Sequence, residues 1–237
     1  MTVNNTWEAL VQKAVAVRDK SLAKVDVPPI PSKLPLNVTG IPAMVLTPEE
    51  VEITEAHDAT SLATAIASKK YTAVTVVKAF MRRAAVAQKL VSHIAMKVEI
   101  DLQVNCVTEL LFDTAIERAK ELDEHLEKTG KTVGPLHGVP ISVKEHIGMK
   151  GLACNAGFVA WIDYIAPDDA GLLKLLYAAG AVFYVRTTEP QTLMHAATSS
   201  AIFGETVNPH NTNLTCGGSS GGEGAIIGMK ASVQFLG

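Results

Sequence analysis

Apolar residues recur at helical spacing in four stretches of the chain, which we expect to form helices. These stretches cover residues 7–22, 59–69, 72–90 and 112–128. The third stretch carries an apolar stripe that is most simply part of the core, made of Val77, Phe80, Met81, Ala84 and Ala85. Arg82 and Arg83 lie off this stripe, so we expect both guanidinium groups to face solvent.

Polar and glycine residues mark the ends of these helices. Asp58, followed by Thr60 and Ser61, is typical of a helix N-cap, and we expect Gly130 to end the fourth helix. The outer face of that helix is rich in charge between residues 117 and 127, which predicts a solvated surface.

Two short apolar segments predict buried strands. Val139, Ile141 and Val143 alternate toward Lys144, and residues 181–187 form a second apolar run. Between them we expect a helix that Asp168 or Asp169 caps and Gly180 ends, carrying Leu172, Leu175, Leu176 and Ala179. This alternation indicates an α/β fold, a sheet covered by helices.

The N-terminal region differs from the rest. Residues 27–35 contain four prolines and predict an extended connector after the first helix. We therefore expect residues 1–50 to form a helical and extended arm, and residues 51–237 to belong to one domain.

Composition excludes several classes of function. The net charge of −3 gives no basic footprint for nucleic acid, and aromatic residues make up only 5% of the chain. No signal peptide or membrane-spanning run is apparent. The three cysteines are widely spaced without a C-x-x-C pair, so a reducing, cytoplasmic location fits best.

The densest chemical signal is the Gly-Gly-Ser-Ser-Gly-Gly run at residues 217–222. Glycines let backbone N–H groups approach a small polar group, and an apolar run after the loop predicts a helix N-terminus. A phosphate loop would need a Gly-Lys-Ser/Thr sequence, which is missing here. Two interpretations of this segment remain, a flexible linker and an acyl-transfer site. The flanking Cys216 and Glu223 are not typical of a linker.

Lys144 ends the first predicted strand, next to apolar residues. Desolvation there would lower its pKa and let the neutral amine act as a base. A strand-capping surface lysine is the structural alternative, and it is the commoner role of a lysine. The histidines do not form a ligand cluster: His137 and His146 flank this strand without a second set of ligands, so we expect no metal.

The segment Gly-Pro-Leu-His-Gly-Val-Pro-Ile-Ser-Val-Lys at residues 134–144, together with the serine loop, resembles the amidase signature family. The likeness covers most of the chain from about residue 51 and is greatest to fungal acetamidases. It implies a mixed sheet covered by helices and hydrolysis of carboxylic amides through a Ser-Ser-Lys triad. It implies no cofactor and a small-molecule amide as substrate. Whether the full-length form is a homodimer stays an open question.

The resemblance assigns roles to individual residues. Lys144 matches the triad lysine, and Ser219 matches the bridging serine, which the family holds on a cis peptide bond. Ser220 matches the neighbouring serine, which supports the site or the substrate. Leu193 and Met194 match positions near the acyl pocket.

The family's nucleophilic serine has no counterpart among residues 1–237. The resemblance places it in a Gly-Thr-Asp-x-Gly-Gly-Ser segment, about six residues past Gly237. We therefore expect this chain to hold part of the domain and to be inactive alone. Two alternatives stay open: a truncated pseudoenzyme or binding protein, and an amidotransferase subunit of the same family, which Glu223-Gly224-Ala225 and the N-terminal arm disfavour.

Overall fold

The computed structural model describes residues 6–31, 33–90, 104–233 and 235–236. The main helices are α1 (Trp7–Leu22), α2 (Ile41–Val45), α3 (Pro48–Glu55), α4 (Ala59–Ala67), α5 (Ala73–Lys89), α6 (Phe112–Thr129), α7 (Gly171–Ala178) and α8 (Gly221–Gly228). The strands are β1 (Val107–Leu110), β2 (Pro140–Lys144), β3 (Val182–Thr187), β4 (Ser199–Ser200), β5 (Gly204–Glu205), β6 (Val207–Asn208), β7 (Asn211–Thr215) and β8 (Phe235–Leu236). Two 3₁₀ turns, η1 (Val159–Trp161) and η2 (Gln191–Leu193), lie in the connections.

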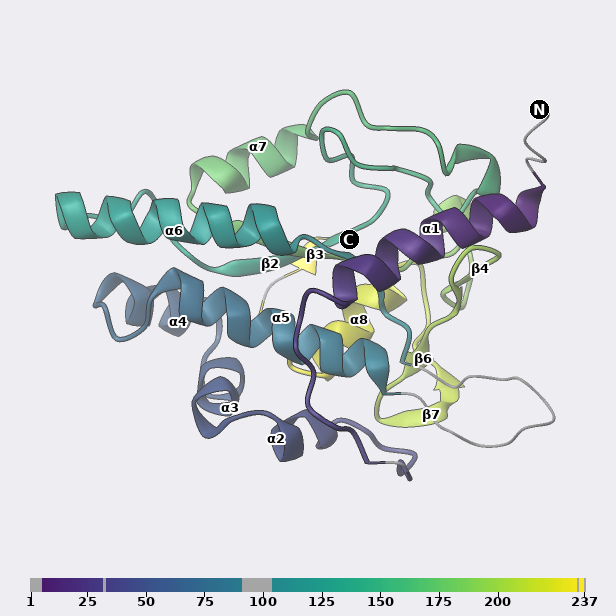
Figure 1. The fold of residues 1–237 in the computed structure, drawn as a ribbon, viewed down its shortest axis with the longest axis horizontal. Helices are drawn as coiled ribbons and strands as arrows, with labels where there is room; N and C mark the ends of the chain where they lie inside the picture. Colours follow the sequence, from purple (N-terminus) through teal and green to yellow (C-terminus); the bar gives the residue numbers. More distant parts are fainter. Residues whose placement is uncertain (1–5, 32, 91–103, 234, 237) are drawn as a thin grey trace.

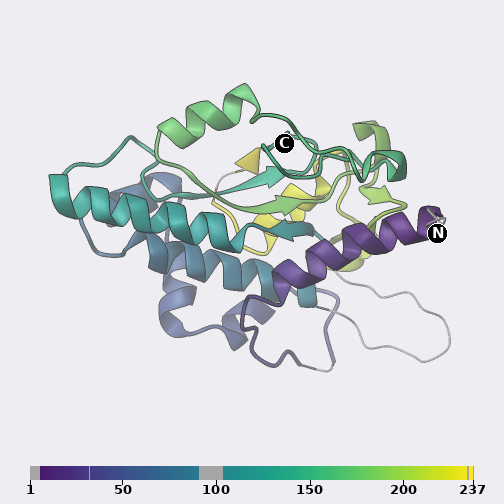
Figure 2. The same ribbon diagram turned by 45° about the horizontal axis from the view of Figure 1, so that its top comes forward.

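The central feature is a four-stranded mixed sheet in the order β1-β3-β2-β8. β2 and β3 run parallel, β8 runs parallel to β2, and β1 is antiparallel to β3. Two small ribbons, β4–β5 and β6–β7, lie beside it. Figure 1 shows the elements, and in Figure 2 the strands lie between α7 on one side and the α5–α6 pair on the other. The sheet and its helical cover confirm the predicted α/β class.

α5 forms the centre of the core. All five residues of the predicted stripe are buried, and they pack with residues of β1, β3, α6 and α8. The expectation of a solvent-facing guanidinium was wrong for Arg83. Arg83 is fully buried, and Arg82 is only partly exposed and paired with Glu50 at 2.9 Å. Burial of Arg83 is possible because its guanidinium finds hydrogen-bond partners on α3 and at the end of α8.

Most of the predicted helix ends are confirmed. Asp58 caps α4 in a reciprocal arrangement with Ser61, and Gly130 ends α6 in the left-handed conformation with φ +66°. The predicted acidic cap of α7 was wrong, because the N-cap is Ala170 and makes no side-chain hydrogen bond. Asp169 instead accepts a hydrogen bond from the Lys150 backbone N–H at 2.7 Å.

α1 and β1 pack together at one edge of the sheet. The Ser21 hydroxyl accepts a hydrogen bond of 2.9 Å from the Leu110 backbone N–H, so the helix satisfies part of the edge strand. α3 runs through position 50, and the division of the chain at that residue stays a prediction.

Candidate active site

Lys144 is the last residue of β2 and is only 2% exposed. All five residues of this strand are buried because β3 and β8 flank it on either side. In the register between the parallel strands, Lys144 pairs with Thr187 at the end of β3. Both side chains therefore lie at the carboxyl end of the sheet, where ligand sites of open α/β sheets are commonly found.

Thr198, just before β4, bonds to the serine loop at two points. The Thr198 hydroxyl donates to the Gly218 carbonyl at 2.7 Å and accepts from the Gly221 backbone N–H at 2.9 Å. Gly217 and Gly218 take positive φ values of +77° and +43°, which residues with a Cβ rarely adopt. As the sequence predicted, the loop then leads into a helix, with Ser220 at the N-cap of α8.

Glycines in the first turn of α8 allow a close approach to the sheet. A Cβ on Gly222 would lie 2.5 Å from the backbone of Thr188, and a Cβ on Gly221 would lie 2.2 Å from the Cys216 sulfur. These contacts are shorter than van der Waals packing allows, so Gly222 lets α8 approach the end of β3 and Gly221 lets it approach Cys216.

The fold brings Lys144 and both loop serines together. The Lys144 Nζ lies 3.1 Å from the Ser219 Oγ and 3.1 Å from the Ser220 Oγ. An amine and a hydroxyl at this separation can exchange a proton directly. The peptide bonds of the described residues are all trans, so the expected cis bond at Ser219 is not found.

Burial lowers the pKa of the Lys144 ammonium, while the carboxylates of Glu189 and Glu223 act in the opposite direction. Desolvation, which the sequence suggested, therefore affects the pKa of Lys144 more than the two carboxylates do. A lysine with a lowered pKa carries more neutral amine near neutral pH, which is the form that can accept a proton.

Glu223, in the first turn of α8, is buried beneath this cluster. Its carboxylate accepts hydrogen bonds from the hydroxyls of Ser142 at 2.6 Å and Thr187 at 2.7 Å. Burial raises the pKa of Glu223 to about 7, although the two hydroxyls and the charge of Lys144 oppose the rise. In the residue pattern Glu223 marks the end of the serine loop and disfavours an amidotransferase subunit, and nothing there indicates that its carboxylate is buried.

A second acidic cluster adjoins Lys144. Glu145 accepts hydrogen bonds from the backbone N–H groups of Asn155 at 2.8 Å and Ala156 at 3.0 Å, and lies 3.6 Å from the Arg186 guanidinium. Glu189 is buried nearby, and burial together with the Glu145 carboxylate raises its pKa well above the usual value. Sequence reasoning missed this cluster because nothing in the residue pattern marks these charges as buried.

Leu193 and Met194, the predicted acyl-pocket residues, lie in and just after η2. Thr192 and Leu193 both have positive φ values, +69° and +58°, and Met194 is 88% exposed. The segment that follows joins the serine loop, because the Ala196 carbonyl accepts from the Gly218 backbone N–H at 3.0 Å. Their role in binding substrate stays a prediction.

Among the residues that the structure describes, no group of three or more His, Cys, Asp or Glu side chains could hold a metal ion. His137 is buried, and its Nδ1 accepts a hydrogen bond from the Val133 backbone N–H at 3.1 Å. In the same part of the chain, no helix is both long enough and apolar enough to cross a bilayer.

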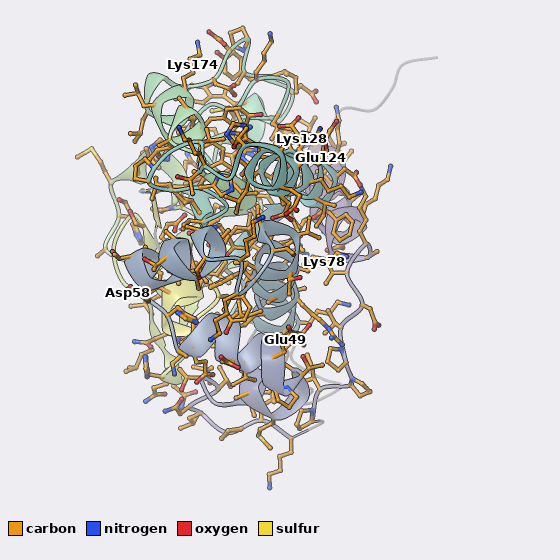
Figure 3. The ribbon with its side chains drawn as sticks, turned by 90° about the vertical axis from the view of Figure 1, so that its left-hand side faces the viewer. Glu49, Asp58, Lys78, Glu124, Lys128 and Lys174 are labelled. Atoms are coloured by element: carbon orange, nitrogen blue, oxygen red, sulfur yellow. The ribbon has the colours of Figure 1, made fainter. Side chains whose placement is uncertain are left out.

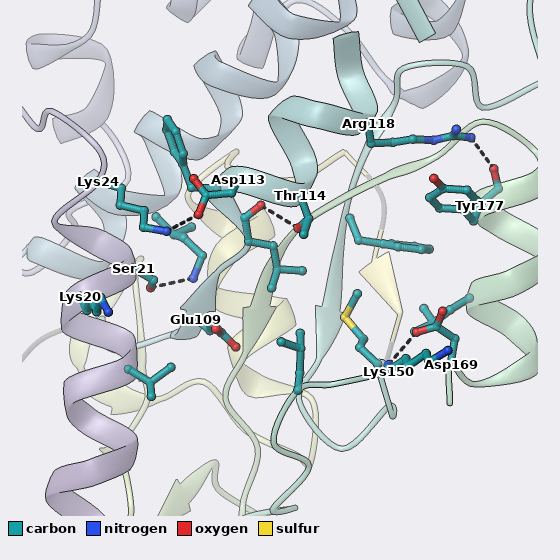
Figure 4. Close-up of a pocket in the computed structure, with 18 residues that line it drawn as sticks. Lys20, Ser21, Lys24, Glu109, Asp113, Thr114, Arg118, Lys150, Asp169 and Tyr177 are labelled. Carbon is teal, nitrogen blue, oxygen red and sulfur yellow. Dashed lines mark hydrogen bonds and ion pairs between the residues drawn. The ribbon is translucent and has the colours of Figure 1, made fainter. Parts of the chain in front are cut away.

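A cavity of about 490 Å³ lies elsewhere, between α1, β1, the start of α6 and α7 (Figure 4). At its rim, Lys24 pairs with Asp113. None of Lys144, Ser219 and Ser220 lines it. The cluster of Lys144 and the two loop serines is therefore separate from this cavity.

Comparison with known proteins agrees with these observations. The chain is 48% identical over 240 residues to an amidase-like protein of Schizosaccharomyces pombe, covering 100% of this chain and 42% of that protein. It is 44% identical over 193 residues to the acetamidase of Emericella nidulans, covering 81% of this chain and 33% of that protein. The chain thus spans well under half the length of these relatives.

Solved structures share the fold. Fatty acid amide hydrolase superposes with a TM-score of 0.84 at 36% identity, covering 98% of this chain and 40% of that one. The peptide amidase of Stenotrophomonas maltophilia gives a TM-score of 0.60 at 28% identity, covering 71% and 33%. The family profile described as Amidase matches residues 76–237, more than half of the chain, and the protein therefore belongs to the amidase family.

Proposed function

We propose that the protein expressed from its full reading frame hydrolyses small carboxylic amides, with Lys144 as the base and Ser219 as the proton relay. The observation that carries this proposal is the hydrogen bond of 3.1 Å between the buried Lys144 and Ser219. A lysine desolvated by burial and bonded to a serine hydroxyl has the properties that an activated nucleophile requires of its base.

In this proposal the attacking serine comes from the segment that the family resemblance places after Gly237. Neutral Lys144 accepts the proton of Ser219 while Ser219 takes the proton of the nucleophile, whose oxygen bonds to the amide carbonyl carbon. The relay then returns a proton to the leaving nitrogen as the C–N bond breaks. Water attacks the resulting ester by the same path and releases the carboxylic acid.

Small amides are the proposed substrates because the acetamidase of Emericella nidulans is among the relatives. In the same proposal Ser220 supports the relay through its own hydrogen bond to Lys144. Leu193 and Met194 contact the acyl group once substrate binds.

Ammonia release from acetamide tests the proposal. We expect turnover by the wild-type protein and a loss of about a hundredfold or more in the Lys144→Met variant, since general-base catalysis contributes this much. Lys128→Met, which alters an exposed lysine of α6, is the matched control and should retain activity. A wild-type protein that leaves acetamide and longer primary amides intact would contradict the proposal, as would full activity in Lys144→Met.

A further inference from the structure

Glu223 connects the helix that follows the serine loop to both strands beside Lys144. One of its partners, Ser142, lies two residues before Lys144 on β2 and so points to the same face of the sheet. The other partner, Thr187, is the residue of β3 that pairs with Lys144. The carboxylate therefore bridges β2 and β3 beside Lys144, and Glu223 follows Ser219 by four residues in the chain.

The burial of the Glu223 carboxylate requires a physical explanation. Glu223 is 1% exposed, and burial of a charge is costly unless hydrogen bonds and opposite charge compensate it. The two hydroxyls provide the hydrogen bonds, the N-terminus of α8 provides partial positive charge, and Lys144 provides the opposite charge. An apolar side chain could fill the space without this cost, so packing alone does not explain a glutamate here.

We propose that Glu223 is a positioning residue for Lys144, which anchors the first turn of α8 to β2 and β3 and presents its carboxylate to the lysine ammonium. The inference rests on the proposed amide hydrolysis, in which Lys144 must meet Ser219. Without the anchor, the first turn of α8 loses its two hydrogen bonds to the strand hydroxyls, and only its N-cap Ser220 remains joined to Lys144. The distance between the lysine and the serine hydroxyls then increases, and proton transfer becomes slower.

The carboxylate also favours the charged form of Lys144, and other groups around the pair act on it as well. Glu189, after β3, has the same effect on Lys144 as Glu223 has. Tyr184 on β3 and Cys106 before β1 interact electrostatically with Glu223, and His146 after β2 interacts with Lys144 in the same way. Removal of the negative charge at residue 223 should therefore lower the pKa of Lys144, while these neighbours stay in place.

Two substitutions at the same position separate anchor from charge. In Glu223→Gln the amide can still accept from one hydroxyl and donate to the other, so the anchor stays and the charge is lost. We expect this variant to keep most of its kcat at its pH optimum, while the acid limb of the pH–rate profile moves to lower pH. In Glu223→Ala both are lost, and we expect kcat to fall about tenfold or more with little change in KM.

The pKa of Lys144 can also be measured without turnover, by NMR titration of protein with ¹⁵N-labelled lysine side chains. The Lys144 signal is assigned by its loss in Lys144→Met. We expect Glu223→Gln to lower this pKa, and Glu205→Gln, which removes an exposed glutamate of β5, to leave it unchanged. If Glu223→Ala does not fold, Thr187→Val removes one of the two donors at constant shape and should lower kcat to a smaller extent.

The outcomes distinguish this inference from the proposed function. A wild-type protein without amidase activity would contradict the function, and the NMR titration would still decide the role of Glu223. An unchanged Lys144 pKa and an unchanged pH–rate profile in Glu223→Gln would overturn the inference. So would a Glu223→Ala variant that folds and keeps the wild-type kcat.

Discussion

Lys144 at the end of β2 donates a hydrogen bond of 3.1 Å to Ser219, which lies 75 residues later in the chain. The residues adjacent to Lys144 and Ser219 in the sequence do not by themselves produce this contact. The strand buries the lysine, and the glycines of the serine loop allow α8 to begin against the strand ends. The contact therefore depends on the packing of α8 as much as on the two side chains.

Two glycines of α8 give a matched test of that packing. Gly222→Ala would place a Cβ 2.5 Å from the backbone of Thr188, so we expect a loss of about 1–3 kcal/mol in the free energy of unfolding. Gly224→Ala meets nothing within 4 Å and should stabilise the helix by about 0.5–1 kcal/mol. Urea unfolding of both variants measures the difference. Equal effects would contradict the close approach of α8 to β3.

Arg83 anchors the other end of α8. Its guanidinium donates to the Met229 carbonyl at 2.7 Å, to the Thr54 hydroxyl at 2.8 Å and to the Glu55 carboxylate at 2.7 Å. We expect Arg83→Met to lower the free energy of unfolding by about 3 kcal/mol, because these buried partners lose their donor.

The control for that prediction is Lys78→Met on the same helix, whose side chain faces outward (Figure 3). This variant should change the free energy of unfolding by less than about 0.5 kcal/mol. Chemical denaturation compares the two, and an Arg83→Met protein as stable as the control would show that Arg83 is not a structural anchor.

Glu223 makes folding stability depend on pH with a defined sign. Its pKa is about 7 in the folded protein and 4.5 in the reference state, so the folded state binds the proton more tightly. This contribution is fully present below pH 4.5 and is lost as the pH rises through about 7. It amounts to about 3 kcal/mol at most.

The measurement is the free energy of unfolding of wild type and Glu223→Gln at several pH values across that window. We expect the wild type to lose stability relative to the variant as the pH rises. A constant difference between the two proteins would contradict a raised pKa at Glu223.

Lys144 should govern the pH dependence of turnover. Because burial lowers its pKa, the neutral amine appears at lower pH than for a solvated lysine, and kcat should rise with pH through that point. A pH–rate profile for acetamide hydrolysis measures this. Turnover that is constant across the titration of Lys144 would argue against a lysine base.

Local sequence patterns predicted the parts of this fold that depend on nearby residues. The stripe of α5, the cap at Asp58 and the strand ending at Lys144 follow from periodicity and from residues within one or two turns. The contact between Lys144 and the serine loop was suggested by the family resemblance, and the structure provides its geometry. The catalytic roles themselves stay proposals.

Long-range partners account for what the sequence could not predict. Arg83 is buried because groups on α3 and α8 satisfy it, and Glu223 because two strands offer hydroxyls to it. The cap of α7 was misplaced because Asp169 bonds a backbone N–H in another loop. Each polar group has a partner that is distant in sequence, and helical or strand periodicity contains no information about such partners.

The central claim is that Lys144 and Ser219 act as one unit, and a double-mutant cycle tests it most directly. Lys144→Ala, Ser219→Ala and the double variant are compared with wild type by kcat for acetamide, using protein expressed from the full reading frame. If the two residues form one relay, the double variant should be about as slow as the slower single variant. Losses that multiply in the double variant, or a Ser219→Ala protein with wild-type kcat, would contradict the relay.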